Sequence, residues 1–156
     1  MRDDNEKRGI RELGFRRWFT DVYWYHYNSQ GSYAKLKTPV GRATTTLAFS
    51  VLLSPEAYPI VFHCIGGTDR TGTFAYLLNA LLGVDEEELV RDYEISFIGG
   101  GVTKQRYEWL EKLIATVRNL PGDTLADKVK RYFISLGFTD EQIENLREFL
   151  LEKKPE

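Results

Sequence analysis

Cysteine and histidine are scarce in this chain, whose 156 residues include one cysteine and two histidines. A single cysteine excludes an internal disulfide and any metal site built from several thiolates. Two histidines without a cysteine pair argue against a structural zinc, so we expect no metal and no cofactor. The single thiol, Cys64, is then an inert core side chain, an accidental residue or a reactive group.

An excess of positive charge is also missing. The chain has 21 lysines and arginines against 23 aspartates and glutamates, which gives a net charge of −2. A nucleic-acid-binding protein normally shows a basic excess, so we expect no nucleic-acid partner. No apolar run approaches the roughly 20 residues that cross a bilayer, and residues 1–8 are charged where a signal peptide is apolar. We therefore expect no membrane span and a cytoplasmic location, although a fragment would hide a signal.

Hydrophobic residues make up 42% of the chain and include three Trp, nine Tyr and nine Phe, which argues against disorder. The length predicts a single domain over residues 1–156. Aromatic and β-branched residues predict a strand at 21–27, and a short apolar run predicts a buried parallel strand at 59–62. Apolar residues at helical spacing predict helices at 4–19, 39–53, 71–82, 86–96 and 102–119, a helix carrying Leu125 to Leu136, and a last helix that follows Thr139. We expect an α/β fold with a short, largely parallel central sheet and a helix-rich C-terminal half.

Several residues are typical of helix ends. The expected caps are Thr38 followed by Pro39, Asp85 paired with Glu88, and Thr139 paired with Gln142. Gly83 and Gly137 are expected to end the helices that precede them, since glycine adopts the left-handed conformation of a C-terminal cap at no steric cost.

One stretch, residues 62–72, reads Phe-His-Cys-Ile-Gly-Gly-Thr-Asp-Arg-Thr-Gly. It lies between a predicted strand and a predicted helix, so backbone N–H groups and the positive end of the helix dipole favour an anion there. The two glycines allow several amides to point at one oxyanion, and an arginine fork suits phosphate oxygens. We expect phosphate to be bound by Ile65, Gly66, Gly67, Thr68, Asp69 and Arg70.

Cys64 begins this loop. The converging amides, the helix dipole and Arg70 all favour the thiolate, so we expect the pKa of Cys64 to lie well below about 8.5. A thiolate beside a bound phosphoester is placed to attack phosphorus and form a phosphocysteine, which water then hydrolyses. Thr71 is expected to donate its hydroxyl to the sulfur, and His63 to orient the loop through its imidazole N–H.

The leaving oxygen needs a proton, and two aspartates are candidates for the general acid. Asp69 lies inside the loop and is the first candidate. Asp21, at the start of the predicted aromatic strand, is the second.

This stretch resembles the cysteine-dependent protein tyrosine phosphatase superfamily, whose signature is His-Cys-x5-Arg-[Ser/Thr]. The fixed residues are all present, as His63, Cys64, Arg70 and Thr71. The similarity is greatest to the atypical bacterial tyrosine and lipid phosphatase branch, whose loop reads His-Cys-x-x-Gly-Lys-Asp-Arg-Thr-Gly. Residues 91–96 resemble that branch's Asp-Tyr-x-x-Ser helix, in which we expect Asp92 and Tyr93 to anchor the helix to the loop, or Asp92 to lie on a solvated face. The resemblance implies that Asp69 is the acid.

Two departures from the branch matter. Thr68 stands where the branch has lysine, which puts activity on polyanionic phosphoinositides in doubt. The family also has an N-terminal half with several strands and an Asp-Leu-Arg stretch, and this chain begins near the end of that stretch, at residues 2–4. We therefore expect a reduced phosphatase-like domain, either a fragment or a short member, that lacks the N-terminal part of the family fold. Its exposed sheet edge would favour a homodimer.

The resemblance implies a metal-independent protein tyrosine phosphatase that acts on a phosphotyrosine protein or a small phosphoester, with phosphate, sulfate or vanadate as ligand analogues. Two alternatives stay open. One is a phosphoinositide or inositol-polyphosphate phosphatase with the same chemistry, and the other is a catalytically impaired phosphate-binding module.

Overall fold

The computed structural model describes residues 36–64, 67–98 and 104–151. In these ranges the chain forms α-helices and short 3-10 helices, with the bounds α2 Pro39–Ser50, η2 Val51–Leu53, η3 Pro55–Ala57, α3 Arg70–Leu82, α4 Glu86–Ile95, α5 Lys104–Arg118, α6 Leu125–Ser135 and α7 Asp140–Leu150. The helices predicted from residue 39 onwards are confirmed, with ends that shift by a few residues. The helix predicted at 4–19 and the strand predicted at 21–27 lie outside the described residues.

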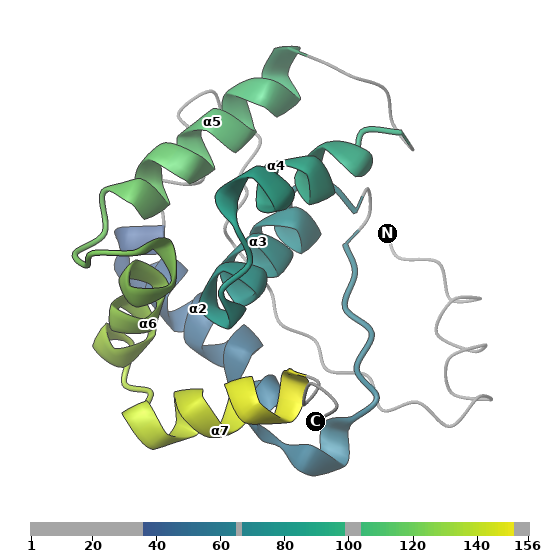
Figure 1. Ribbon diagram of the computed structural model, residues 1–156. Coiled ribbons are helices and arrows are strands. Elements are labelled where there is room, and N and C mark those ends of the chain that lie inside the picture. The colour runs from purple at the N-terminus through teal and green to yellow at the C-terminus, as the bar shows by residue number, and fades with distance from the viewer. Residues whose placement is uncertain (1–35, 65–66, 99–103, 152–156) are drawn as a thin grey trace, which may run out of the picture.

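Helix α3 lies in the middle of the arrangement (Figure 1). Both α4 and α6 contact it, α5 packs against α6, and α7 contacts η2. No helix in the described ranges combines the length and the apolar character that crossing a membrane requires. The position of α3 matters because its first turn follows directly on the loop that contains Cys64.

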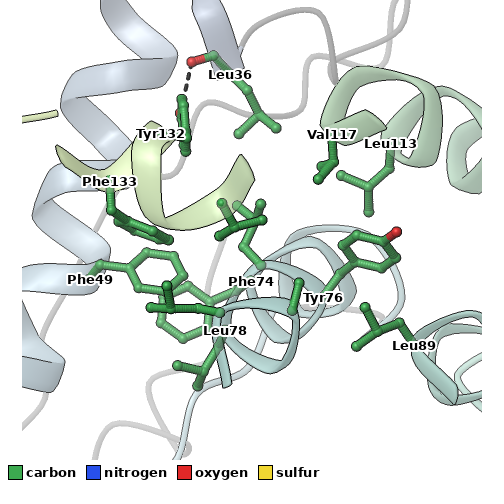
Figure 2. Close-up of a cluster of buried hydrophobic side chains, with 14 of the residues drawn as sticks. Leu36, Phe49, Phe74, Tyr76, Leu78, Leu89, Leu113, Val117, Tyr132 and Phe133 are labelled. Atoms are coloured by element: carbon green, nitrogen blue, oxygen red, sulfur yellow. Dashed lines mark hydrogen bonds between the residues drawn. The ribbon is translucent and has the colours of Figure 1, made fainter. Parts of the chain in front are cut away.

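The core surrounds α3 on more than one side, as expected for a helix with few polar residues. Three phenylalanine rings from different helices meet on one side, since Phe49 of α2 stacks on Phe74 of α3 with centroids 4.4 Å apart and contacts Phe133 of α6 at 4.3 Å (Figure 2). Tyr76 of α3 belongs to the same buried cluster with Leu113 of α5. Burial of each large side chain contributes about 1.5–3 kcal/mol, so this cluster fixes α3 in place.

The prediction of an α/β fold with a central parallel sheet is wrong for the described residues, which contain no strand. Residues 59–62 have no regular secondary structure, and Val61 is 79% exposed where a buried strand was expected. The physical reason is that an apolar run indicates only a tendency to be buried, whereas a strand needs a neighbouring strand for its backbone hydrogen bonds. Pro59 also has no N–H to donate. Without a sheet edge in the described ranges, the expected homodimer has no support.

Two predicted helix starts are confirmed in atomic detail. The Thr38 hydroxyl accepts a hydrogen bond from the Gly41 N–H at 3.1 Å, and proline follows at the first position of α2. At α7 the Thr139 hydroxyl accepts from the Gln142 N–H at 3.1 Å, and the Gln142 side chain accepts from the Thr139 N–H at 2.9 Å. Each side chain thereby satisfies a backbone donor that the first helical turn leaves without a partner.

The other predicted ends give a mixed result. Gly83 and Gly137 follow α3 and α6 with φ of 92° and 104°, the left-handed region that favours glycine, as predicted. The capping box predicted for Asp85 and Glu88 is wrong, because the Asp85 side chain makes no capping hydrogen bond. Three glutamates in the first turn of α4 favour the positive end of the helix dipole, so this start does not depend on a cap.

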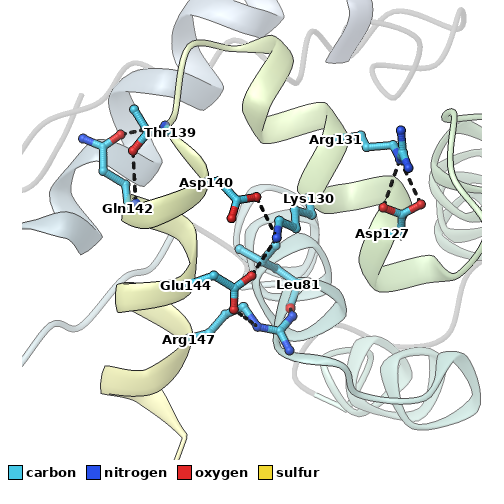
Figure 3. Close-up of polar contacts among 9 residues, drawn as sticks. All are labelled: Leu81, Asp127, Lys130, Arg131, Thr139, Asp140, Gln142, Glu144 and Arg147. Atoms are coloured by element: carbon cyan, nitrogen blue, oxygen red, sulfur yellow. Dashed lines mark hydrogen bonds and ion pairs between the residues drawn. The ribbon is translucent and has the colours of Figure 1, made fainter.

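A polar network joins α7 to the rest of the protein (Figure 3). The Lys130 ammonium of α6 lies 2.8 Å from both Asp140 and Glu144 of α7. Arg147 of α7 donates to the Leu81 carbonyl at the end of α3. Because these bonds link three helices, they orient α7 relative to α3 and α6.

Candidate active site

The segment that leads to the site runs from Pro59 to Cys64 without helix or strand. The Phe62 ring contacts Phe74 of α3, with centroids 4.6 Å apart. Cys64 is half-buried and, as the only cysteine, forms no disulfide within the chain. The contact between the two rings places this segment beside the first half of α3.

The loop turns into α3 through Gly67, Thr68 and Asp69. Gly67 has φ of 73°, a conformation that a side chain would strain. Asp69 is the N-cap residue and Arg70 is the first residue of α3, with the Thr73 N–H donating to the Asp69 carbonyl at 2.7 Å. Cys64 and Arg70 therefore stand at the two ends of a loop that enters the positive end of a helix dipole. Ile65 and Gly66, two of the predicted phosphate-binding residues, lie outside the described residues.

Asp69 has an unusual environment for an N-cap aspartate. Its side chain makes no capping hydrogen bond, and its Oδ1 atom is buried with no hydrogen-bond partner among the described residues. Burial raises the pKa of Asp69, while the positive charges of Arg106 and, to a smaller extent, Arg70 lower it. Because the first effect is larger, the pKa of Asp69 is raised, so the carboxyl keeps its proton to a higher pH than an ordinary aspartate does; the protonated form is the one that a general acid needs.

Thr68, which replaces the lysine of the similar branch, is 2% exposed. Its hydroxyl donates to the Ser96 carbonyl at 3.3 Å, just after the end of α4. The side chain therefore ties the loop to α4 and brings no charge to the site.

Helix α4 also approaches the loop through Tyr93, which is 1% exposed. A Cβ atom on Gly72 would lie 2.7 Å from Cε2 of the Tyr93 ring, so only glycine fits this contact in the first turn of α3. The Tyr93 ring therefore packs α4 against the first turn of α3, directly after the loop. Asp92 is exposed, which agrees with the alternative of a solvated helix face.

The remaining predicted residues are placed as follows. His63 is exposed, and its Nδ1 atom donates to the Cys64 carbonyl at 3.2 Å. The Thr71 hydroxyl is buried and has no hydrogen-bond partner among the described residues, so the predicted bond from this hydroxyl to the sulfur is not formed. Asp21 lies outside the described residues.

Arg106, in the first turn of α5, has an electrostatic effect on Asp69 that the sequence did not indicate. Its charge acts on Asp69, and its guanidinium carbon lies 5.9 Å from the centroid of the Phe97 ring. No local motif surrounds it, and it lies far along the chain from Arg70, so only the packing of α5 could have identified it.

Potential metal ligands do not gather in the part of the chain that the structure describes, where no three His, Cys, Asp or Glu side chains form a group suited to a metal ion. The loop and the start of α3 instead carry a thiol, an arginine and a carboxyl with a raised pKa, and the charge of a second arginine, Arg106, acts on that carboxyl. Such a set suits binding of an anion next to a nucleophile and an acid.

The chain is similar to known tyrosine phosphatases. Residues 24–152 match the model of the tyrosine phosphatase family. A tyrosine-protein phosphatase of the bacterium Nostoc commune is 42% identical over 48 residues, which are 31% of this chain and 16% of that relative's length. No solved structure matches the chain. Since the family model covers well over half of the sequence, the chain belongs to the tyrosine phosphatase family.

Proposed function

We propose that this chain hydrolyses phosphomonoesters through a phosphocysteine on Cys64, with phosphotyrosine in proteins as its best substrate. The observation that carries the proposal is the start of α3 at Arg70, which directs the positive end of the helix dipole at the loop that Cys64 begins. Membership of the tyrosine phosphatase family supports the same assignment.

In the first proposed step the Cys64 sulfur attacks phosphorus, so that an S–P bond forms as the ester P–O bond breaks. Protonated Asp69 gives its proton to the leaving oxygen, and Arg70 binds the oxygens of the phosphoryl group. In the second step water attacks the phosphocysteine, the S–P bond breaks and the Asp69 carboxylate accepts the proton of the water. The raised pKa of Asp69 supports its role as the acid in the first step.

The substrate preference follows from Thr68. A lysine at this position would add a positive charge for the further phosphates of a phosphoinositide, whereas the Thr68 hydroxyl is committed to the Ser96 carbonyl. A substrate with a single phosphate on an aromatic ring therefore fits better than a polyphosphorylated inositol. Phenolic oxygen is also a better leaving group than the serine alkoxide, which favours phosphotyrosine over phosphoserine.

The test is a substrate panel in the presence of EDTA. We expect hydrolysis of para-nitrophenyl phosphate and a phosphotyrosine peptide with an acidic pH optimum, and slower hydrolysis of a phosphoserine peptide and of phosphoinositides. Cys64→Ser should abolish turnover while phosphate still binds. Because the chain has no other cysteine, alkylation by one equivalent of iodoacetate should inactivate it, and phosphate should protect it.

Three outcomes would contradict parts of the proposal. Full turnover in Cys64→Ser would remove Cys64 from the mechanism. Loss of activity in EDTA with recovery in zinc or magnesium would overturn the metal-free scheme. Phosphate binding by the natural sequence without turnover of any substrate in the panel would favour the phosphate-binding module instead.

A further inference from the structure

The end of α4 supports the turn that leads from Gly67 into α3. The Thr68 side chain is 2% exposed, and its hydroxyl donates to the Ser96 carbonyl at 3.3 Å. Ser96 is the C-cap residue of α4, and the carbonyls at the end of a helix have no intrahelical partner. One side chain therefore satisfies an acceptor at the end of α4 and fixes the residue that precedes the N-cap of α3.

The same part of α4 meets α3 again one helical turn further along. The Tyr93 ring packs so closely on Gly72 that a Cβ atom there would lie 2.7 Å from the ring, and the Gly72 N–H donates to the Thr68 carbonyl at 3.1 Å. The Ser96 hydroxyl donates to the Tyr93 carbonyl at 2.6 Å, which keeps the two α4 residues together. Because α4 lies beside α3 (Figure 1) and holds it at Thr68 as well as at Gly72, the start of α3 cannot pivot about a single contact.

This support bears on phosphate binding because Arg70 follows Thr68 by two residues and begins α3. Gly67, directly before Thr68, has φ of 73° and the conformational freedom of glycine, so the turn needs a restraint from outside its own backbone. A turn that was free to move would have to be ordered when the anion binds, and that ordering would weaken binding. The hydrogen bond from Thr68 to α4 orders the turn in advance.

We infer that Thr68 is a positioning residue: its hydrogen bond to the Ser96 carbonyl holds the start of α3, and with it Arg70, in the orientation that binds phosphate. The inference rests on the proposed function for its ligand, the phosphoryl group. Thr68 acts through Arg70 and the first turn of α3, and its effect on binding can be measured without turnover.

The test is calorimetric titration of the full chain with inorganic phosphate at one fixed pH. Thr68→Val removes the hydroxyl and keeps the shape of the side chain, so the affinity for phosphate should fall about three- to tenfold. Thr68→Ser keeps the hydroxyl and should keep most of the affinity. Thr44→Val is the matched control, since Thr44 is also buried but its hydroxyl donates to the Gly41 carbonyl at 3.0 Å within α2, and its affinity for phosphate should equal that of the natural sequence.

Urea unfolding of every variant shows which of them are folded under the conditions of the titration. Thr68→Ala also removes the hydroxyl, should show a loss of affinity at least as large, and replaces Thr68→Val if the valine variant does not fold.

Equal phosphate affinity in the natural sequence and in folded Thr68→Val would overturn the inference, even if the enzyme is fully active. An equal loss of affinity in Thr44→Val would overturn it as well, because binding would then follow general stability. Turnover of para-nitrophenyl phosphate separates the inference from the proposed function. Weaker phosphate binding in Thr68→Val alone, together with no turnover by the natural sequence, would support the positioning role and contradict the proposed hydrolysis. A natural sequence that binds no phosphate would contradict the inference.

Discussion

At the scale of single residues, two buried tyrosines show how one atom's partner decides a side chain's contribution. The Tyr132 hydroxyl donates to the Leu36 carbonyl at 2.8 Å, which joins α6 to the residues before α2 (Figure 2). The Tyr76 hydroxyl is also buried but has no hydrogen-bond partner among the described residues, and burial raises the pKa of Tyr76. Both rings belong to the same buried cluster, so the two side chains differ in whether the hydroxyl has a hydrogen-bond partner among the described residues.

This difference gives a matched pair of substitutions. Tyr132→Phe leaves the buried Leu36 carbonyl without its donor and should lower the free energy of unfolding by about 1–2 kcal/mol. Tyr76→Phe removes a buried hydroxyl that is not bonded, so it should change stability by less than about 0.5 kcal/mol or increase it. Urea unfolding followed by fluorescence measures both. Equal losses in the two variants would mean that the Tyr76 hydroxyl has a partner after all.

The site residues differ in how far the sequence alone could identify them. Cys64, Asp69 and Arg70 fall in one continuous string, so their spacing and residue types were enough to select them as candidates. Arg106 could not be found in this way, because its electrostatic effect on Asp69 depends on how segments far apart in the sequence pack together. Thr71 shows a further limit, since the sequence indicates a donor for the sulfur, whereas the buried Thr71 hydroxyl has no hydrogen-bond partner among the described residues.

At the scale of elements, helices can be predicted from the local sequence, whereas strands depend on distant parts of the chain. The caps at Thr38 and Thr139 and the glycine after α3 act within one turn, so a local pattern predicts them. The run at 59–62 was predicted as a strand from its apolar residues, but strand formation depends on a neighbour that the local pattern does not contain. Helical spacing could therefore be interpreted residue by residue, whereas the expected sheet could not.

The contact between α3 and α4 gives a prediction at this scale. Gly72→Ala would normally stabilise a helix by roughly 0.5–1 kcal/mol. Here the added Cβ would lie 2.7 Å from the buried Tyr93 ring, and such overpacking costs about 1–3 kcal/mol, so a net loss of stability is expected. Thermal unfolding of Gly72→Ala, Tyr93→Leu and the double variant measures the effect.

The double variant tests the cause of that loss. With leucine at position 93 the ring atoms that meet the new Cβ are gone, so Gly72→Ala should cost much less than it does beside tyrosine, and the two effects should not add. A stabilising Gly72→Ala in the natural background would show that α4 can move away from α3 without cost.

At the scale of the whole molecule, the carboxyl of Asp69 that the proposed activity uses also lowers the stability of the folded protein. Its pKa is raised in the folded protein, so the folded chain holds this proton more tightly than the unfolded chain does. The stability that this proton contributes to the folded state is fully present below the unfolded pKa of about 3.9, and it is lost as the pH rises through the pKa of the folded state. At neutral pH the ionised carboxyl therefore lowers the stability of the fold that positions it, as expected for a functional group kept in an unfavourable environment.

Asp69→Asn removes the loss of stability that the ionised carboxyl causes, and it also removes the proposed acid. At pH 7 the variant should be more stable than the natural sequence, by less than about 1 kcal/mol because water screens a partly exposed carboxyl. The gain should shrink as the pH falls, because the carboxyl of the natural sequence then takes up a proton and loses its charge. Hydrolysis of phenyl phosphate, whose leaving group needs a proton, should slow more than hydrolysis of para-nitrophenyl phosphate.

Asp123→Asn, at an exposed turn residue, is the control and should change neither the stability nor the rates of hydrolysis. A variant that loses stability at pH 7 and slows both substrates equally would identify Asp69 as a structural residue. Loss of a general acid would instead slow the poor leaving group more than the good one.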